Sequence, residues 1–332
     1  MKRNDGNLKK QMEESLSIKE NNFGPVISTG STLLDLAISG ERIRGGGIPA
    51  GLMIEIYGPE NIGKSVLLYQ IMAHIQRQGG NASLNDTEQR SDFEFASLFG
   101  AELDEDNVIY ETSIKNTFEY IREKFKIVDG KINGFFIDSL ANLDEPDTQG
   151  GYSGARRASI FTEEIRRTAA WTKNTESIIV CSNQIRDNIG VTFGEKTRAA
   201  GASRQAKHQF SLIIKISNPQ KRTVSKTING VKISKVAGTS FSAKITKSSI
   251  DKPFREAQVH IEFDYGVDDI RGNLQYLKQM TGAKKYFTDE ISVSKAIENI
   301  EKDNLEKQLK EKVINLWQEI ENEFKQNRKK FF

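Results

Sequence analysis

Short apolar runs alternate with segments of helical spacing through the middle of the chain. Four runs are almost continuously apolar, as the buried strands of a parallel sheet are: residues 53–57, 132–138, 177–182 and 211–216. Four segments between them carry apolar side chains three or four residues apart, which predicts helices: residues 65–78, 92–99, 117–126 and 159–173. This alternation predicts an α/β fold, in which helices flank a mainly parallel central sheet.

The pattern changes at both ends of the chain. Residues 8–18 form a polar, amphipathic stretch, which predicts a short N-terminal helical arm over residues 1–26. The core then occupies residues 27–268, and residues 269–332 form a small C-terminal helical domain. One face of a long helix in that domain is apolar and is expected to belong to its core: Leu305, Leu309, Val313, Leu316, Trp317, Ile320 and Phe324.

Composition narrows the cellular context. No stretch of the 332 residues approaches the roughly 20 apolar residues of a membrane span, and no apolar signal segment follows the first residues. We therefore expect a cytoplasmic protein with no membrane partner. The single cysteine, Cys181, lies in an apolar run and is expected to be a buried strand thiol. The three histidines lack metal-ligand spacing, so zinc chemistry is not expected.

Charge is distributed unevenly, although the net charge is only +3. Between residues 196 and 252 there are thirteen lysines or arginines and one acid, Asp251. Such asymmetry is typical of a face that binds a polyanion. A solvated surface, with acids brought close by the fold, would give the same composition, so both interpretations stay open at this point.

A complete phosphate-binding loop lies between a predicted strand at residues 52–57 and a predicted helix at residues 66–72. Its residues are Gly58, Pro59, Glu60, Asn61, Ile62, Gly63, Lys64 and Ser65. The two glycines let backbone N–H groups face one anion, Lys64 can reach the β and γ phosphates, and the Ser65 hydroxyl can hold a magnesium ion. The sequence therefore predicts binding of a nucleoside triphosphate.

Two carboxylates complete this predicted site. Asp138 ends an apolar strand that would lie beside the phosphate loop, where it can hold the magnesium ion directly or through water. A further strand over residues 82–88 would deliver Glu88 to the same edge of the sheet, where it could take a proton from the attacking water. Solvated acids near the start of a helix would be the alternative interpretation of Glu88.

These segments resemble the RecA family of strand-exchange recombinases, including its phage-encoded members. The similarity covers residues 27 to about 290 and is carried by residues 27–31 (Ile-Ser-Thr-Gly-Ser), 47–51 (Gly-Ile-Pro-Ala-Gly) and 55–60 (Glu-Ile-Tyr-Gly-Pro-Glu). Residues 183–194, Asn-Gln-Ile-Arg-Asp-Asn-Ile-Gly-Val-Thr-Phe-Gly, resemble the family's second DNA-binding loop and are much more specific than the phosphate loop. The resemblance implies a RecA-like P-loop ATPase core that uses ATP and Mg²⁺.

The resemblance also implies roles for individual residues. Glu88 matches the catalytic glutamate, which would act with Lys64, and Gln184 matches a glutamine that senses the γ phosphate and relays its presence to the DNA loop. Asp92 and Phe95 match positions near the adenine. The family sends two lysines across the subunit interface to the neighbour's ATP. Lys247 matches the first and Ser249 occupies the second position, which implies weakened hydrolysis.

Two loops would contact DNA if the resemblance holds. The first, residues 144–154, leads into Arg156 and Arg157, and the second covers residues 186–204. Cationic side chains in the second loop could neutralise phosphates: Arg186, Lys196, Arg198 and Arg204. Its apolar side chains could insert between bases or stack on them: Ile189, Val191 and Phe193. Ordinary surface loops with a partly buried apolar trio are the alternative.

The function implied is that of an ATP-dependent, single-stranded-DNA-binding recombinase. Such a protein would pair single-stranded DNA with homologous duplex DNA, exchange strands in recombination and repair, and hydrolyse ATP when DNA is bound. A hexameric helicase-type motor and a non-catalytic regulatory paralogue are the alternatives. The family strand that packs on the neighbouring subunit is absent or much shortened before residue 27, so a homo-oligomer is expected as a helical filament or as a ring.

Overall fold

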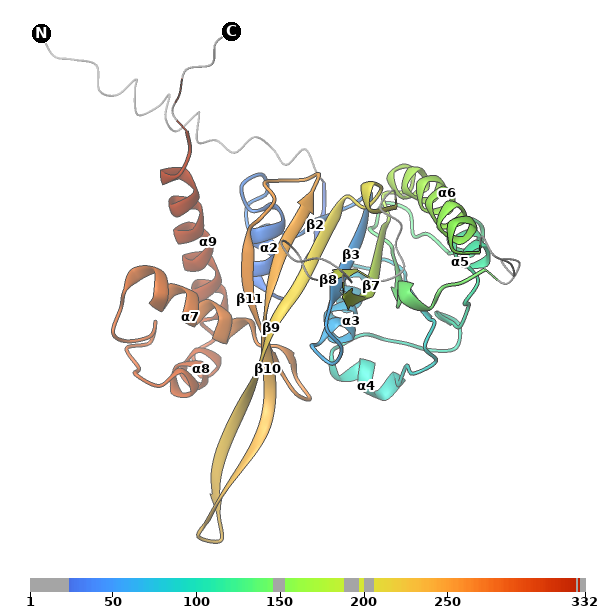
Figure 1. Cartoon of the computed structure of the whole chain (residues 1–332). Helices are drawn as coiled ribbons and strands as arrows, with labels where there is room; N and C mark the ends of the chain where they lie inside the picture. The colour runs from blue at the N-terminus through green and yellow to red at the C-terminus, as the bar shows by residue number, and fades with distance from the viewer. Residues whose placement is uncertain (1–23, 146–152, 188–196, 200–205, 327, 329–332) are drawn as a thin grey trace, which may run out of the picture.

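A large twisted sheet organises the computed structural model, which describes residues 24–145, 153–187, 197–199, 206–326 and 328 (Figure 1). Its parallel strands are β3 (Leu52–Gly58), β4 (Ala82–Asp86), β5 (Val108–Ile109), β6 (Gly134–Asp138), β7 (Ile178–Asp187) and the first part of β9 (Leu212–Ile228). The strand order is β12-β11-β10-β9-β3-β7-β6-β4-β5, and the short β8 (Thr197–Ala199) pairs with β7. The mainly parallel α/β fold predicted from the sequence is confirmed.

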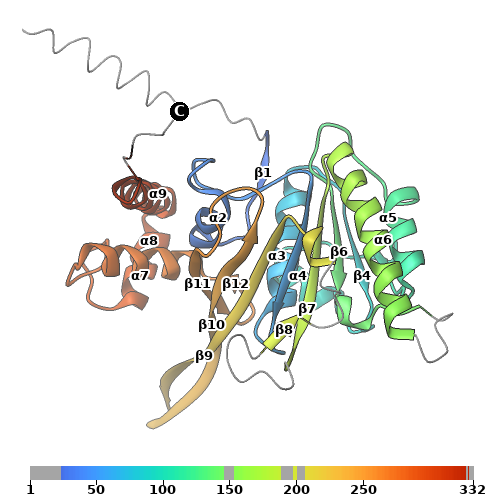
Figure 2. The same cartoon turned by 45° about the horizontal axis from the view of Figure 1, so that its top comes forward.

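Helices cover both faces of this sheet (Figure 2). One face carries α2 (Thr32–Ser39) and α3 (Lys64–Arg77), and the other carries α5 (Ile114–Glu123) and α6 (Ser153–Asn174). Strand β3 serves both layers because alternate side chains point to opposite faces: Ile54 and Ile56 belong to one core, and Met53 and Tyr57 to the other. The four predicted strands correspond to β3, β6, β7 and β9, and the four predicted helices to α3, α4 (Phe93–Leu98), α5 and α6.

One side of the sheet is antiparallel, which the apolar pattern did not predict. Strand β9 continues well past residue 216 and pairs with β10 (Val231–Ser248), which in turn pairs with β11 (Glu256–Glu262) and, beyond it, β12 (Gly266–Val267). The outer half of the β9–β10 hairpin is exposed and rich in polar residues, so it contains no apolar run. Its turn is Asn229-Gly230, with φ of 50° and 78°, as a two-residue hairpin turn requires.

Cys181 lies in β7, where its thiol is free and fully buried. Burial, with a smaller contribution from Glu55, raises the pKa of this thiol well above its ordinary value. The expectation of an unreactive strand thiol is therefore confirmed. No helix in the described part of the chain is both long and apolar enough to cross a bilayer.

Three helices follow the sheet: α7 (Asp269–Thr281), α8 (Val293–Lys302) and α9 (Glu306–Glu323). Leu309 and Val313 of the predicted apolar stripe are buried, as expected, and Ile314 joins them in the core. Phe324 was wrongly included in the stripe, because α9 ends one residue earlier and this side chain is 81% exposed.

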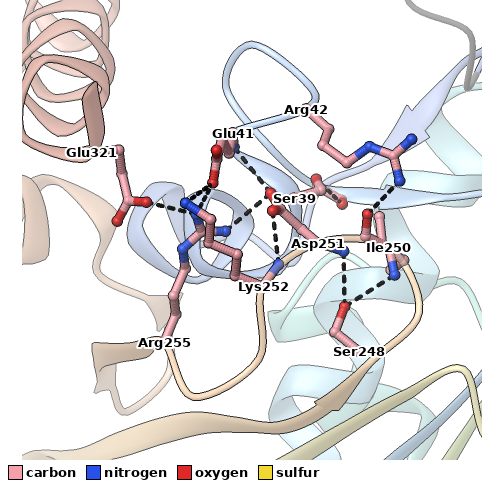
Figure 3. Close-up of polar contacts among 10 residues, drawn as sticks. Ser39, Glu41, Arg42, Ser248, Ile250, Asp251, Lys252, Arg255 and Glu321 are labelled. Carbon is pink, nitrogen blue, oxygen red and sulfur yellow. Dashed lines mark hydrogen bonds and ion pairs between the residues drawn. The ribbon is translucent and has the colours of Figure 1, made fainter. Parts of the chain in front are cut away.

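Ion pairs centred on Arg255 fasten α9 to the core (Figure 3). The Arg255 guanidinium lies 2.8 Å from Glu41 Oε2, 3.0 Å from Asp251 Oδ2 and 2.6 Å from Glu321 Oε2. It also lies over the Trp317 ring, 4.9 Å from the ring centroid. One arginine thus joins α9 to the segment after α2 and to the turn between β10 and β11.

A second group of polar contacts surrounds Asp35, on α2, and involves the segment that precedes this helix. Its carboxylate is buried and accepts hydrogen bonds from Ser28 Oγ at 2.5 Å, Thr29 N at 2.8 Å and Thr29 Oγ1 at 2.7 Å. These bonds fold residues 28–31 over the start of α2, where the Ser31 side chain caps the helix by accepting from Leu34 N. A conspicuous part of the sequence motif at residues 27–31 therefore has a structural role.

Candidate nucleotide-binding site

The phosphate loop connects the end of β3 to the start of α3. Gly63 has a φ of 103° and directly precedes the helix, and Asn61 has a φ of 54°. The left-handed φ at Gly63 favours a glycine, and a Cβ atom there would also lie 2.4 Å from Ile261 Cδ1, so the Ile261 side chain would have to shift. The amino end of a 14-residue helix is thereby directed at the loop, an arrangement that favours a bound anion.

A cavity of about 560 Å³ opens at this end of the sheet. Its walls come from the phosphate loop, the segment after β4, the end of β6 and Gln184 of β7. The carboxyl ends of parallel strands meet here, and ligands bind at this edge in open α/β sheets. The volume falls in the range of small-molecule sites.

Ser65 and Asp138 meet at the bottom of this cavity. The Ser65 hydroxyl donates to Asp138 Oδ2 at 2.7 Å, and the Ser182 hydroxyl donates to Asp138 Oδ1. Hydroxyl and carboxylate oxygens are ligands that Mg²⁺ accepts. Among the described residues, no group of three or more His, Cys, Asp or Glu side chains could hold a metal. An ion here would therefore complete its coordination with phosphate or water oxygens.

Lys64 lies across the mouth of the loop. Its ammonium group donates to the carbonyl oxygens of Gly58 at 3.2 Å and of Pro59 at 2.6 Å. Burial lowers the pKa of Lys64, and the charges of Asp138, Glu60 and Glu88 partly oppose that effect. The cation is thus held beside the backbone that would surround a phosphate.

Glu88 and Gln184 contact each other at the side of the cavity. Gln184 Nε2 donates to Glu88 Oε1 at 3.3 Å, and Ser139 Oγ lies 3.5 Å from the same oxygen. Strand pairing places Gln184 directly beside Gly58, the first residue of the phosphate loop. The other carboxylate oxygen of Glu88 pairs with Arg90 at 3.0 Å. Glu88 lies two residues beyond the end of β4, and its contact with Gln184 is one that the sequence did not predict.

From the sequence Asp86 was only the alternative to Glu88 as the base, and the structure shows what its carboxylate contacts. Its buried carboxylate accepts hydrogen bonds from the backbone N–H groups of Glu88 at 3.1 Å, Arg90 at 2.6 Å and Ser91 at 2.6 Å. These bonds hold the turn that carries Glu88. An acid at the end of a strand, followed by a polar turn, is the sequence signal that could have identified it.

Phe95 lines the cavity and Asp92 does not, although the two residues are three positions apart. The Phe95 ring lines the cavity, is 42% exposed and packs edge-on against Phe99, with 4.8 Å between ring centroids. Tyr69 packs edge-on against Phe95 at 6.4 Å. Asp92 caps α4, because its Oδ1 accepts from Phe95 N at 3.1 Å. The aromatic ring is available for stacking, whereas the carboxylate positions the helix that carries it.

Lys247 lies on β10, away from this cavity. Its ammonium group donates to the carbonyl oxygens of Lys207 at 3.0 Å and His208 at 2.7 Å. Burial lowers the pKa of this lysine. A role at the ATP of a neighbouring subunit stays a prediction.

The expected DNA-binding residues are only partly described. Arg157 is engaged within the chain: its Nε pairs with Asp144 at 3.2 Å, and its Nη2 donates to the Leu143 carbonyl. Arg156 is exposed near the start of α6. The backbones of Arg186 and Arg198 are opposite each other where β7 pairs with β8. Five expected contact residues lie outside the described residues: Ile189, Val191, Phe193, Lys196 and Arg204.

Comparison with known proteins agrees with this geometry. The family model described as RecA N-terminal domain matches residues 9–268. Protein RecA of Thermus thermophilus is 30% identical over 288 residues, which are 80% of this chain and 79% of that protein. Protein RecA of Delftia acidovorans is 28% identical over 246 residues, or 73% of this chain. That match spans 63% of the Delftia protein, which is less than two thirds of its length.

Proposed function

Because this chain belongs to the RecA family, we propose that it is an ATP-dependent recombinase that assembles on single-stranded DNA and promotes homologous pairing and strand exchange. The observation that carries the proposal is the contact between Gln184 and Glu88 inside the phosphate cavity. Gln184 lies on β7, which leads directly into the segment that resembles a DNA-binding loop. The binding of nucleotide and the binding of DNA would therefore be linked through β7.

In this proposal the phosphate loop binds ATP. Backbone N–H groups at the start of α3 surround the phosphates, and Lys64 moves from the loop carbonyls to the β and γ phosphates. Phe95 stacks on the adenine. Ser65 and Asp138 would hold Mg²⁺, which neutralises charge on the phosphates.

Hydrolysis would use Glu88 as the base that takes a proton from the attacking water. Asp86 keeps Glu88 in position by fixing the turn that follows β4. Lys64 stabilises the negative charge that develops on the γ phosphate. Ser249, at the second of the two interface positions, would leave turnover slower than a second lysine would allow.

Coupling to DNA would pass through Gln184. An amide can donate to a phosphate oxygen, so a bound γ phosphate would compete with Glu88 for the Gln184 side chain. The end of β7 enters the second predicted DNA loop and pairs with β8, which lies within that loop. A shift of the amide can therefore change the order of that loop, which makes ATP an assembly switch between subunits.

The test is a titration of labelled single-stranded DNA with and without a slowly hydrolysed ATP analogue. In the parent, the analogue should increase DNA affinity, and DNA should stimulate ATP turnover. Gln184→Ala should still bind the analogue but lose its effect on DNA affinity, because the relaying amide is gone. Lys64→Ala should lose both responses. An intact analogue effect in Gln184→Ala would contradict the switch, and undiminished turnover in Lys64→Ala would contradict the site.

A further inference from the structure

Residues 218–237 form a two-stranded arm that extends beyond the body of the sheet (Figure 1). Strand β9 pairs with β3 only through residues 212–215, and β10 pairs with β11 only from Gly238 to Lys244. Between those limits the two strands of the arm pair only with each other. At about 3.4 Å per residue, the 11 residues from 218 to 228 reach roughly 35 Å.

Charge on the arm has one sign. The arm contains five cations, Lys221, Arg222, Lys226, Lys232 and Lys235, and no acid. Arg222 is paired with Glu262 at the base of the arm. The four lysines have no ion-pair partner among the described residues, and all four are exposed. Two copies of this arm would repel each other, whereas a polyanion would be attracted.

The register divides the arm into two different faces, because residues directly opposite each other in an antiparallel pair share a face. The aliphatic face carries Val224, Lys226, Ile228, Val231, Ile233 and Lys235. The hydroxyl face carries Lys221, Thr223, Ser225, Thr227, Lys232, Ser234 and Val236. Ile228, Val231 and Ile233 are 51%, 61% and 40% exposed, so the aliphatic face is unusually apolar for an unpaired ribbon.

We propose that the aliphatic face of this arm lies in the major groove of double-stranded DNA. A major groove about 12 Å wide admits a two-stranded β-ribbon. Lysines at the margins of the ribbon can meet phosphates, and β-branched aliphatic side chains can contact thymine methyl groups on the groove floor. This face combines the two kinds of contact, because Lys226 lies opposite Ile233 and Lys235 lies opposite Val224.

The direction of the arm supports this assignment. Strand β9 runs parallel to β3 and continues past its last pair with that strand, so the arm leaves the sheet at the edge where β3 enters the phosphate loop. The end of β7 and its partner β8, both of which contribute to the second predicted DNA loop, lie at the same edge (Figure 1). A DNA duplex on the arm would thus lie near the edge of the sheet at which single-stranded DNA is proposed to bind. The arm lies outside the nucleotide cavity, so duplex binding there would need no nucleotide.

The experiment measures binding of the full chain to a short labelled duplex, without nucleotide, over a series of salt concentrations. Lys226→Gln with Lys235→Gln should flatten the slope of log affinity against log salt by about 1.8, at about 0.9 per lost phosphate contact. The matched control, Lys221→Gln with Lys232→Gln, removes the same charge from the hydroxyl face and should retain the parent's slope. Ile228→Thr with Ile233→Thr should weaken binding while keeping the slope, because only apolar contacts are lost.

Three results would overturn the inference. Equal slopes in the parent and in the aliphatic-face lysine variant would mean that these lysines do not meet phosphates. An equally flattened salt slope in both lysine variants would mean that duplex binding depends only on the net charge of the arm. A changed oligomer size in the arm variants, with duplex binding intact, would assign the arm to a second copy of the chain. Each variant should keep the parent's urea midpoint, since the arm lies outside both cores.

Failure of this inference can be told apart from failure of the proposed function. The arm variants should retain the effect of an ATP analogue on single-stranded DNA, because none of their residues lines the nucleotide cavity. If the arm variants lose duplex binding and the parent shows no effect of the ATP analogue on single-stranded DNA, the arm assignment stands and the proposed switch is contradicted. If the ATP effect is intact and the arm variants bind duplex DNA as the parent does, the switch stands and the arm assignment is contradicted.

Discussion

Glu88 and Asp86 are two residues apart after the same strand, and their carboxylates have different surroundings. Asp86 is buried and accepts three backbone hydrogen bonds, so its oxygens are committed to the turn. Glu88 faces the cavity and contacts side chains only, Gln184, Ser139 and Arg90. Of these two carboxylates, Glu88 is therefore the one that we propose as the acceptor of a proton from the attacking water.

Glu88→Gln should therefore slow ATP hydrolysis about a hundredfold or more while leaving ATP-dependent DNA binding in place, because the amide keeps the shape but cannot accept the proton. Steady-state turnover with saturating DNA, together with binding of the ATP analogue, measures both effects.

Asp86→Asn is the informative comparison. It should reduce both nucleotide binding and turnover, and it should also lower the urea midpoint, because the turn loses acceptors for its backbone N–H groups. Unchanged turnover in Glu88→Gln, with strongly reduced turnover and full stability in Asp86→Asn, would exchange the two roles.

At the scale of elements, two arginines join α9 to the first part of the core in different environments. Arg255 is 11% exposed and contacts the Asp251 carboxylate, which is 3% exposed. Arg44 pairs with Glu311 where both side chains are open to water, at 41% and 59% exposure. Removing one partner of a buried ion pair strongly lowers the free energy of unfolding, whereas an exposed ion pair contributes little to it.

Arg255→Met should lower the free energy of unfolding by about 3 kcal/mol, because it leaves Asp251 buried without its cation. Arg44→Met, the matched control at the other arginine that pairs with a glutamate of α9, should cost less than about 1 kcal/mol. Urea unfolding of both variants measures the difference. Equal losses would show that burial does not distinguish these two connections.

At the scale of the whole molecule, buried carboxylates link stability to pH. Burial raises the pKa of Asp35 from 3.8 to about 6, although hydrogen bonds from Ser28 and Thr29 oppose the rise. The folded chain therefore binds the Asp35 proton more tightly than the unfolded chain does. This group stabilises the fold below about pH 4, and that contribution is lost as the pH rises through about 6.

Asp35→Asn should remove this part of the pH dependence. A pKa of 3.8 in the unfolded chain and of about 6 in the folded one corresponds to at most about 3 kcal/mol across that interval. The difference between parent and variant is the quantity to measure by urea unfolding, because burial also raises the pKa of Glu55 and Asp269. A difference that does not change between pH 4 and pH 6 would contradict the assignment.

Local signals in the sequence were sufficient for the parallel part of the sheet and for the phosphate loop. Buried parallel strands are apolar on both faces, and helices that cover them keep a 3.6-residue period, so both are visible within short windows. The turn at Asn229-Gly230 was equally local, but the exposed arm around it has no apolar run. The hairpin was therefore missed although its turn signal was present.

What the sequence by itself determined was the α/β fold class and the residue types of the phosphate loop, because strand period and glycine-dependent loop geometry depend on near neighbours. Tertiary structure alone decided which polar groups meet. Strand register sets Gln184 beside Gly58 and within reach of Glu88, and the folding of the chain brings Arg157 of α6 to Asp144. Pairing between strands that are distant in the sequence likewise decided the direction in which the arm leaves the sheet. Such contacts depend on how the whole chain folds, and the residues next to a position in the sequence do not determine them.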